Sequence, residues 1–353
     1  MPVDERDTMF ARMALSEGSE SFRHYYENHP EKKEVDDSIR ALPDLGSSET
    51  PTYDRNGSPV TEGLFRMLAD LRPLAEGEPI SVPVESDPRL LSRWVKGLAL
   101  YLGANDVGIA AMGPELYYSH RGRQESSHGQ PVDENFPRAV AIISAMDARM
   151  IHKGPKAPVM MESASGYLKS GVTAIAVAYA IREMGYRARA HMDGNYLVVV
   201  SRVAVAAGLG AFGRSGLVIH RRFGPCARIS VVTTDMPMTP DSIDPAGNAV
   251  RSFCELCGRC SAFCPGGAIP SGTALEGAPN PWPLNAEKCY ETWRRIGTDC
   301  GVCISSCPFT AGLDWKELED SQGRGEALEE ILLRCGGKGS PRPFDPAPPC
   351  WWR

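Results

Sequence analysis

The chain has 353 residues, of which 42% are hydrophobic and 23% charged, and its net charge is −6. The length allows one large or two medium domains, and the negative charge argues against nucleic acid as the main partner, because phosphate binding needs a basic surface. No run of about 18 apolar residues is found, and the first residues, MPVDERDTMF, lack the charged and apolar pattern of a secretion signal. We therefore expect a cytoplasmic protein without a transmembrane segment, in a reducing compartment where clustered cysteines indicate metal ligands.

The first part of the chain, residues 1–88, is polar and rich in proline. Its weak periodicity predicts an irregular or helical region that wraps around a core; disorder is the alternative. The next stretch, RLLSRWVKGLALYLG, predicts a helix that ends at Gly103.

Residues 89–238 alternate between strand and helix patterns. The short apolar runs DVGIAAM and AVAIISAM predict strands. Apolar residues at helical spacing in SGYLKSGVTAIAVAYAIREMGY predict a helix that stops at Gly185, and YLVVVSRVAVAAGLG predicts another helix. GLVIH and ARISVVTTD predict two strands that pair with each other. The order of elements suggests an α/β sandwich.

Eight of the eleven cysteines lie in residues 250–315, after a turn-rich linker at 239–249. The first run is Cys254-x2-Cys257-x2-Cys260-x3-Cys264-Pro265. The second run is Cys289-x10-Cys300-x2-Cys303-x3-Cys307-Pro308. Residues 316–353 form the C-terminal tail, which ends in a low-complexity stretch with two tryptophans.

The spacing of these runs is typical of two 4Fe-4S clusters, in which the fourth cysteine of a run binds the other cluster. One cluster would then take Cys254, Cys257, Cys260 and Cys307. The other would take Cys264, Cys289, Cys300 and Cys303. Two structural zinc sites are the alternative, although zinc motifs rarely contain three closely spaced cysteines followed by Cys-Pro. Cys226, Cys335 and Cys350 remain outside this arrangement.

Four stretches resemble the reductive dehalogenases. They are LNAEKCYETWRRIGTDCGVCISSCPFT, AGLGAFGRSGLVIHRRFGPCARISVVTTDMPM, GYLKSGVTAIAVAYAIREMGY and YYENHPEKKEVDDSIRALP. A more distant similarity links the chain to epoxyqueuosine reductase, through the AGLG element and the paired cysteine motifs. The resemblance covers most of the chain.

This resemblance implies a mixed α/β and α+β protein. A nitroreductase-like α/β core at 89–238 would bind a base-off corrinoid, cobalamin, and a ferredoxin-like module at 250–315 would hold two 4Fe-4S clusters. The clusters would pass electrons to cobalt for reductive carbon–halogen cleavage in anaerobic metabolism.

The resemblance also suggests catalytic residues. Arg214, in AFGRSG, matches a lysine or arginine near the upper face of the corrinoid, where a cation stabilises developing negative charge. The family tyrosine expected after Met146-Asp147 is replaced by Ala148. The substitutes for this proton donor are Tyr118 or its neighbour Tyr117, His191, and Asp193 in HMDGN.

Small residues are candidates for contact with the corrinoid. Gly208, Gly210 and Gly213 would let the backbone approach a large flat ring. Ser165, Gly166 and Ser170 would bracket its tail or phosphate at a helix N-terminus.

The expected function is therefore a corrinoid-dependent iron–sulfur reductase that acts on a small molecule, for example an organohalide. Its electrons would come from a separate low-potential ferredoxin, flavodoxin or reductase, and a homo-oligomer is compatible with the sequence. One alternative is a related corrinoid reductase that acts on an epoxide or an activated alkene. Another is an electron-transfer protein without corrinoid.

Overall fold

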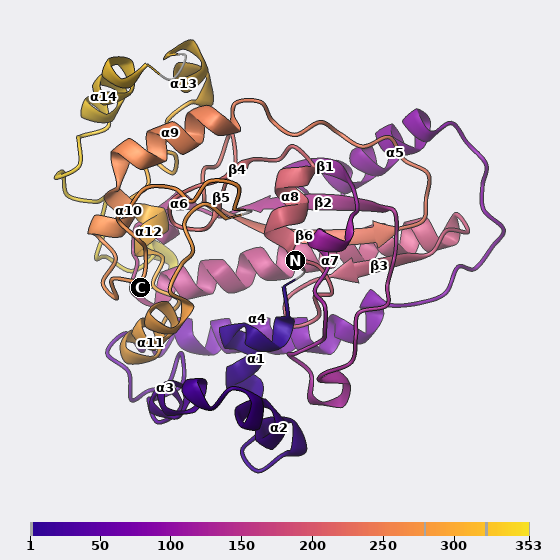
Figure 1. Ribbon diagram of the computed structural model, residues 1–353, viewed down its shortest axis with the longest axis horizontal. Coiled ribbons are helices and arrows are strands. Elements are labelled where there is room, and N and C mark those ends of the chain that lie inside the picture. The colour runs from indigo at the N-terminus through magenta and orange to yellow at the C-terminus, as the bar shows by residue number, and fades with distance from the viewer. Residues whose placement is uncertain (1–2, 279, 322–323, 353) are drawn as a thin grey trace.

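The computed structural model describes residues 3–278, 280–321 and 324–352. The N-terminal part, expected to be irregular or helical, is helical and lies along one side of the molecule (Figure 1). Thr8 and Ser19 cap α1 and α2, and Pro30 occupies the first position of α3. Its helices are η1 (Glu5–Asp7), α1 (Met9–Ala14), α2 (Glu20–Asn28), α3 (Pro30–Arg40), α4 (Gly57–Leu71) and η2 (Arg72–Ala75).

A four-stranded antiparallel sheet forms the centre of the molecule, with the strand order β1-β2-β6-β3. Its side chains alternate between two apolar clusters, as the period of a strand requires: Val140 and Ile142 face one cluster, and Ala141 and Ile143 face the other. Its strands are β1 (Asp106–Ala111), β2 (Arg138–Ala145), β3 (Ala188–His191) and β6 (Ala227–Thr234).

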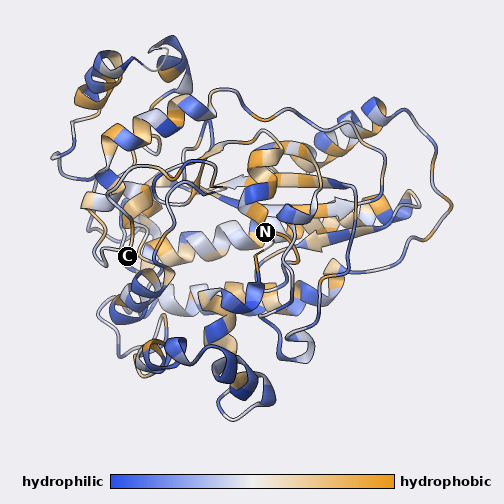
Figure 2. Cartoon of the chain, viewed as in Figure 1, coloured by the Kyte–Doolittle hydropathy of each residue, from blue (hydrophilic) through white to orange (hydrophobic). Residues whose placement is uncertain are grey.

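Helices cover both faces of this sheet. Helix α7 (Ala157–Glu183) packs across β2, β3 and β6, together with α4 and α5 (Pro88–Tyr101), and α8 (Val200–Ala206) packs on the opposite face (Figure 1). Blue dominates α2 and α3 in Figure 2, in keeping with their place outside this central core. Within the described ranges, no helix is long and apolar enough to cross a membrane.

Three expectations about these elements need correction. GLVIH and ARISVVTTD do not pair with each other: β5 (Val218–Ile219) pairs with β4 (Ala211–Phe212), while β6 lies between β2 and β3. Helix α7 begins at Ala157, eight residues before Ser165. The helix expected over residues 196–210 is confined to α8. Pairing partners are distant in sequence, so periodicity within one segment cannot identify them.

The cysteine-rich part builds a second apolar core around Phe253, Trp282, Phe309 and Trp315. Gly258 and Gly301 adopt positive φ angles of 61° and 64° directly before the short helices α10 and α12. Its helices are α9 (Gly247–Cys257), α10 (Arg259–Ala262), α11 (Ala286–Ile296), α12 (Val302–Ser305), α13 (Trp315–Ser321) and α14 (Gly325–Arg334). Short helices elsewhere are η3 (Pro114–Leu116), η4 (Glu125–Ser127), α6 (Ala148–Ile151) and η5 (Cys350–Trp352).

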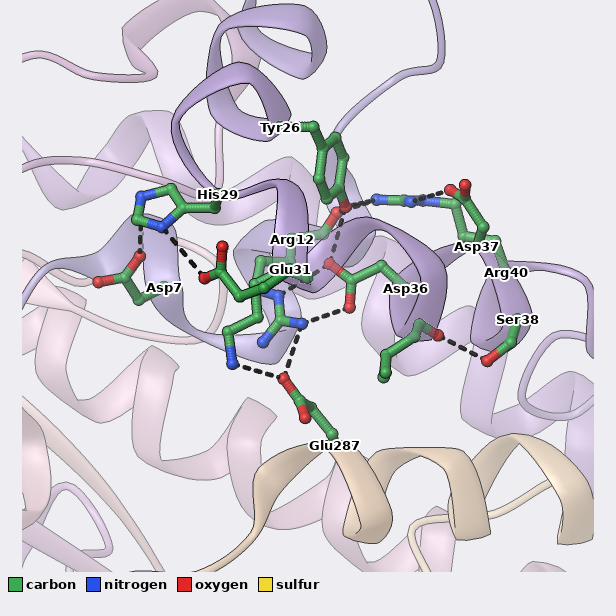
Figure 3. Close-up of polar contacts among 12 residues, drawn as sticks. Asp7, Arg12, Tyr26, His29, Glu31, Asp36, Asp37, Ser38, Arg40 and Glu287 are labelled. Carbon is green, nitrogen blue, oxygen red and sulfur yellow. Dashed lines mark hydrogen bonds and ion pairs between the residues drawn. The ribbon is translucent and has the colours of Figure 1, made fainter.

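Charged residues fasten the N-terminal helices to α11 (Figure 3). Arg12 donates from Nε to Asp36 Oδ2 at 2.9 Å and from Nη2 to Glu287 Oε1 at 2.9 Å. Lys32 Nζ also donates to Glu287 Oε1, at 3.0 Å. Because Glu287 lies two residues before Cys289, this contact joins the N-terminal helices to the segment that carries a predicted ligand.

The C-terminal tail also docks on the body of the protein. Lys153 is ion paired with Asp345 and donates to Ala347 O at 2.6 Å. The ring of Trp352 packs so closely on Gly57 that a Cβ there would lie 2.4 Å from its nearest carbon. The tail therefore crosses from the loop after α6 to the start of α4.

Candidate functional site

A cavity of about 470 Å³ lies where the N-terminal helices, α7 and the cysteine-rich part meet. This volume falls within the range of about 300–1,000 Å³ that is usual for ligand and cofactor sites. Most of its wall is apolar. The apolar lining includes Phe10, Leu45, Phe65, Val159, Met160, Leu217, Ile269, Leu284, Trp293 and Ile304.

One wall of the cavity carries Cys264, Cys289, Cys300 and Cys303. These four cysteines lie close enough to interact electrostatically. Burial raises the pKa of the Cys303 thiol, and the charges of the other three cysteines raise it further. Burial raises the pKa of the Cys289 thiol to about 12. Four thiols from two separate segments thus face one another at the cavity.

The other four cysteines gather on the side away from the cavity. Cys307 has Cys254, Cys260 and Cys257 as its electrostatic neighbours. The charge of Cys260 also raises the pKa of the Cys303 thiol, so the two sets of cysteines lie next to each other. In the described residues, no three Cys, His, Asp or Glu side chains are close enough to hold a single metal ion. Around a cubane each cysteine binds a different iron, which requires wider spacing.

A cluster of polar groups in the cavity lining adjoins the loop of Cys300. Arg228, from β6, places its guanidinium 4.6 Å from the centre of the Tyr167 ring and donates to Ser163 Oγ at 2.5 Å. The same guanidinium nitrogen lies 3.3 Å from Asp299 Oδ2. Ser163 also donates to that carboxylate. Asp299 precedes Cys300, so this carboxylate connects a cysteine loop to α7 and β6.

Two atoms of this cluster are buried without a hydrogen-bond partner among the described residues, namely Arg228 Nε and Asp299 Oδ1. Buried polar atoms are almost always satisfied, by protein, water or ligand. Both residues line the cavity. The wall therefore offers one donor and one acceptor to a molecule bound inside.

Tyr167 presents the hydroxyl-bearing ring nearest these groups. Burial raises its pKa, and the positive charge of Arg228 opposes that rise. Gly166 is needed for this arrangement, because a Cβ there would lie 2.9 Å from Arg228 Cγ. Tyr167 therefore stays protonated at neutral pH beside a fixed cation.

Asp193 is the predicted catalytic residue that lines the cavity. It lies in the turn after β3, where Arg123 Nη1 donates to its Oδ1 at 3.2 Å and Arg72 lies 3.9 Å from its Oδ2. Arg123 lines the cavity too, with its guanidinium 5.0 Å from the centre of the Phe10 ring.

His191 and Tyr118 lie outside the lining of this cavity. His191 is fully buried: Nε2 contacts Thr233 Oγ1 at 2.8 Å, and Nδ1 accepts from Leu197 N at 3.1 Å. Burial lowers its pKa to about 4, so the ring is neutral at pH 7. Burial also raises the pKa of Tyr118 to about 12. In this structure neither side chain is placed to act on a molecule in the cavity.

Arg214 is likewise not among the lining residues; it lies beneath the loop of the first cysteine run. Its guanidinium donates to four backbone carbonyls and packs 5.1 Å from the Trp282 ring centre. The acceptors are the carbonyl oxygens of Cys254, Glu255, Pro270 and Gly272. Its neighbours thus differ from the expected ones: it holds the cysteine loop.

The small residues predicted to contact a corrinoid pack against the protein instead. A Cβ would lie 2.3 Å from Ser242 O at Gly208, 2.4 Å from Ile219 O at Gly210, and 2.8 Å from Ile219 at Gly213. Ser165, Gly166 and Ser170 lie inside α7, which corrects their placement at a helix N-terminus. Ser170 Oγ donates to Tyr167 O at 3.2 Å, within the helix.

The sequence interpretation missed Tyr167, Arg228, Arg123 and Asp299. Tyr167 and Arg228 both lie in stretches that carried the family resemblance, and Asp299 adjoins a predicted ligand. The tyrosine was sought after Met146-Asp147, whereas the cavity takes one from the neighbouring helix. The sequence contains one signal for them: a tyrosine and an arginine, with no other assigned role, lie in the stretches that resemble the reductive dehalogenases.

Comparisons with known proteins agree with this geometry. Residues 253–327 match the family model of a 4Fe-4S dicluster domain. The cysteine-rich part therefore defines the class: the protein is an iron–sulfur protein.

Relatives then identify the family. The chain is 30% identical over 306 residues to the tetrachloroethene reductive dehalogenase of Sulfurospirillum multivorans, a match that covers 77% of this chain and 57% of the relative. A weaker match, 27% over 140 residues, is to the epoxyqueuosine reductase of Lactococcus garvieae. The predicted resemblance is confirmed: the chain is a homologue of the reductive dehalogenases. It spans little more than half the length of the first of these relatives.

The fold is shared with a solved structure, the catabolic reductive dehalogenase NpRdhA. The TM-score is 0.72 at 23% identity, and the match covers 95% of this chain and 46% of that one. The likeness shows the fold of nearly the whole chain.

Proposed function

We propose that the protein is a corrinoid-dependent iron–sulfur reductase that removes halogen from a small organohalide. The observation that carries the proposal is one cavity whose lining contains four cysteines together with Tyr167 and Arg228. Electrons and a proton would then meet in a single apolar chamber. The similarity to tetrachloroethene reductive dehalogenases supports the same chemistry.

The cysteines fit two 4Fe-4S clusters in the predicted partition. Cys264, Cys289, Cys300 and Cys303 would hold the cluster beside the cavity, and Cys254, Cys257, Cys260 and Cys307 the cluster behind it. The neighbour relations of Cys303 and Cys307 support each set. The electrostatic influence of Cys260 on Cys303 indicates that the two sets lie close together, which would allow electrons to pass from one cluster to the other.

The cavity also fits a base-off corrinoid in a nitroreductase-like core. Its apolar wall would hold the macrocycle through Val159, Leu217, Leu284 and Ile304, and the unpartnered Arg228 Nε and Asp299 Oδ1 indicate that a bound group completes the site. A bound corrinoid supplies a low-potential cobalt centre that delivers electrons to the carbon–halogen bond.

The side chains of this protein would supply the proton and hold the halide. In the overall reaction, two electrons and one proton convert the carbon–halogen bond into a carbon–hydrogen bond and release a halide ion. Tyr167 would donate the proton from its Oη to carbon, and Arg228 would stabilise the tyrosinate and the halide. The apolar lining excludes water, which strengthens both interactions.

An epoxide or activated alkene remains the second candidate substrate, because Asp193 lines the cavity. Its carboxylate is ion paired with Arg123 and accepts a hydrogen bond from Arg123 Nη1 at 3.2 Å, so this group already has a partner within the protein. This contact favours Tyr167 as the donor and the organohalide as the substrate.

The test is the metal content of protein purified without oxygen from a host supplied with cobalamin. About eight iron and one cobalt per chain, together with halide release from a panel of organohalides, are expected. Eight iron without cobalt would instead indicate an electron carrier, and zinc in place of iron would overturn the proposal. Reduction of an epoxide or alkene without halide release would favour the second substrate.

A further inference from the structure

A surface hollow of about 420 Å³ lies on the side of the cysteine-rich part away from the cavity. It is formed where α12, the turn after α14 and the tail meet. Arg259 ties these parts together, since it donates from Nε to Ser306 O at 3.1 Å and from Nη1 to Gly337 O at 2.5 Å. The hollow is therefore built by a buried arginine that joins two segments.

Cys307 lines this hollow. Of its neighbours, Cys254 and Cys257 are buried, whereas Cys307 is only partly buried. The set of cysteines behind the cavity thus approaches the surface at the hollow. Cys260 interacts electrostatically with both Cys307 at the hollow and Cys303 at the cavity. These three cysteines therefore connect the hollow to the cavity.

The rim of the hollow, defined here as Arg334, Glu317 and the adjacent Lys338, has two cations and one carboxylate, although the protein as a whole has a net charge of −6. Arg334 lines it with a side chain that is 60% exposed, and Lys338 is exposed three residues beyond Cys335. Glu317 is the acidic residue of the lining and is ion paired with Arg334. The acidic residues of α14 lie on its preceding turns, outside the lining.

We propose that this hollow is the docking surface for the electron donor, a small acidic protein that carries one electron at a time. The inference rests on the proposed function, because it requires a cluster on Cys254, Cys257, Cys260 and Cys307. In each encounter the carrier is oxidised by one electron and that cluster is reduced by one. Two encounters supply the electrons for one substrate. Complementary charge at the rim accelerates such encounters and makes them sensitive to salt.

The test measures cluster reduction, not dehalogenation. The purified iron–sulfur protein is mixed with a small acidic flavodoxin that has been fully reduced beforehand, and the appearance of the blue flavin semiquinone, formed when the flavodoxin gives up one electron, is followed. The double variant Arg334→Glu/Lys338→Glu should lower the second-order rate constant about tenfold at low salt. The difference should disappear near 1 M salt, where the Debye length is about 3 Å.

The matched control is Arg89→Glu/Arg93→Glu, which changes the same charge on exposed residues of α5, at the other end of the molecule (Figure 1). It should be reduced at nearly the parent rate, and dithionite should reduce all three proteins equally. If dithionite also reduces the rim variant slowly, Arg334→Gln/Lys338→Gln carries the same test with a smaller expected effect.

A parent-like rate for the rim variant, or an equal loss in the control, would overturn the docking surface. A failure of dehalogenation alone would leave this result intact, because the readout needs neither corrinoid nor substrate. Protein that lacks iron would instead overturn the proposed function itself.

Discussion

The two sets of four cysteines differ in what surrounds them. Cys264, Cys289, Cys300 and Cys303 line an apolar cavity that also contains a tyrosine and an arginine, whereas Cys307 of the other set lines a surface hollow whose exposed rim carries Arg334. Cysteines of one run, such as Cys303 and Cys307, therefore end in different environments. The difference shows that the tertiary packing around a motif, and not its spacing, decides whether it faces substrate or partner.

Loss of one cysteine from each set gives the largest expected contrast. Cys300→Ala should lose about four iron per chain and all activity with any reductant, because the missing cluster adjoins the cavity. Cys254→Ala should also lose about four iron but keep measurable activity with a small chemical reductant that reaches the remaining cluster. Iron analysis and halide release check both. Cys350→Ser, on an exposed residue, is the control, and equal behaviour of the two cluster variants would contradict the contrast.

Tyr167→Phe tests the proposed proton donor in the cavity. We expect kcat to fall by about 10²–10⁴, the usual contribution of a positioned acid, with iron content unchanged. Tyr118→Phe, which removes a hydroxyl outside the cavity lining, serves as the matched control. Comparable losses in both variants would show that the effect is structural.

The pH dependence of the free energy of unfolding should report on His191, which is buried in the sheet and does not line the cavity. His191 has a folded pKa of about 4 against an ordinary 6.5, so the unfolded chain binds the proton first as the pH falls. The free energy of unfolding therefore has its full value above the ordinary pKa of histidine. It falls as the pH approaches 4, by an amount on the order of 3 kcal/mol. Denaturant unfolding at pH 7 and pH 4.5 measures it. His191→Gln should show a shallower pH dependence, and an unchanged slope would contradict this role.

The smallest effect is expected at the contact between the N-terminal helices and α11. Glu287→Gln weakens the bonds from Arg12 and Lys32 and should cost about 1 kcal/mol, because Arg12 keeps Asp36. Thermal unfolding of the holoprotein is the measurement. Lys33→Gln removes an ion pair with Asp37 within α3 and should lower the stability less. A larger loss for Lys33→Gln than for Glu287→Gln would contradict a stabilising role of Glu287 between the N-terminal helices and α11.

The sequence predicted those features that depend on short-range patterns. The cysteine runs of the 4Fe-4S dicluster domain could be recognised from their local spacing, and β1, β2 and β6 from runs of apolar residues. The pairing of β6 with β2 and β3 could not be read in this way, because the strands come together across long separations.

The candidate site shows the same limit. Tyr167 and Arg228 are 61 residues apart in sequence, and only the packing of α7 on β6 brings them together. Arg214 was assigned by its place in a motif, but its hydrogen bonds go to carbonyls between Cys254 and Gly272. The chemistry of a side chain can be predicted from its type, while its partner is known only from the fold.

Asp299 has a further consequence. Its carboxylate holds Ser163 and Arg228, and its backbone continues directly into Cys300. The arginine beside Tyr167 is thus positioned by the same loop that would bind iron. We expect oxidative loss of that cluster to release the arginine as well, so that a damaged molecule becomes silent as a whole and retains no half-assembled centre for unwanted side reactions.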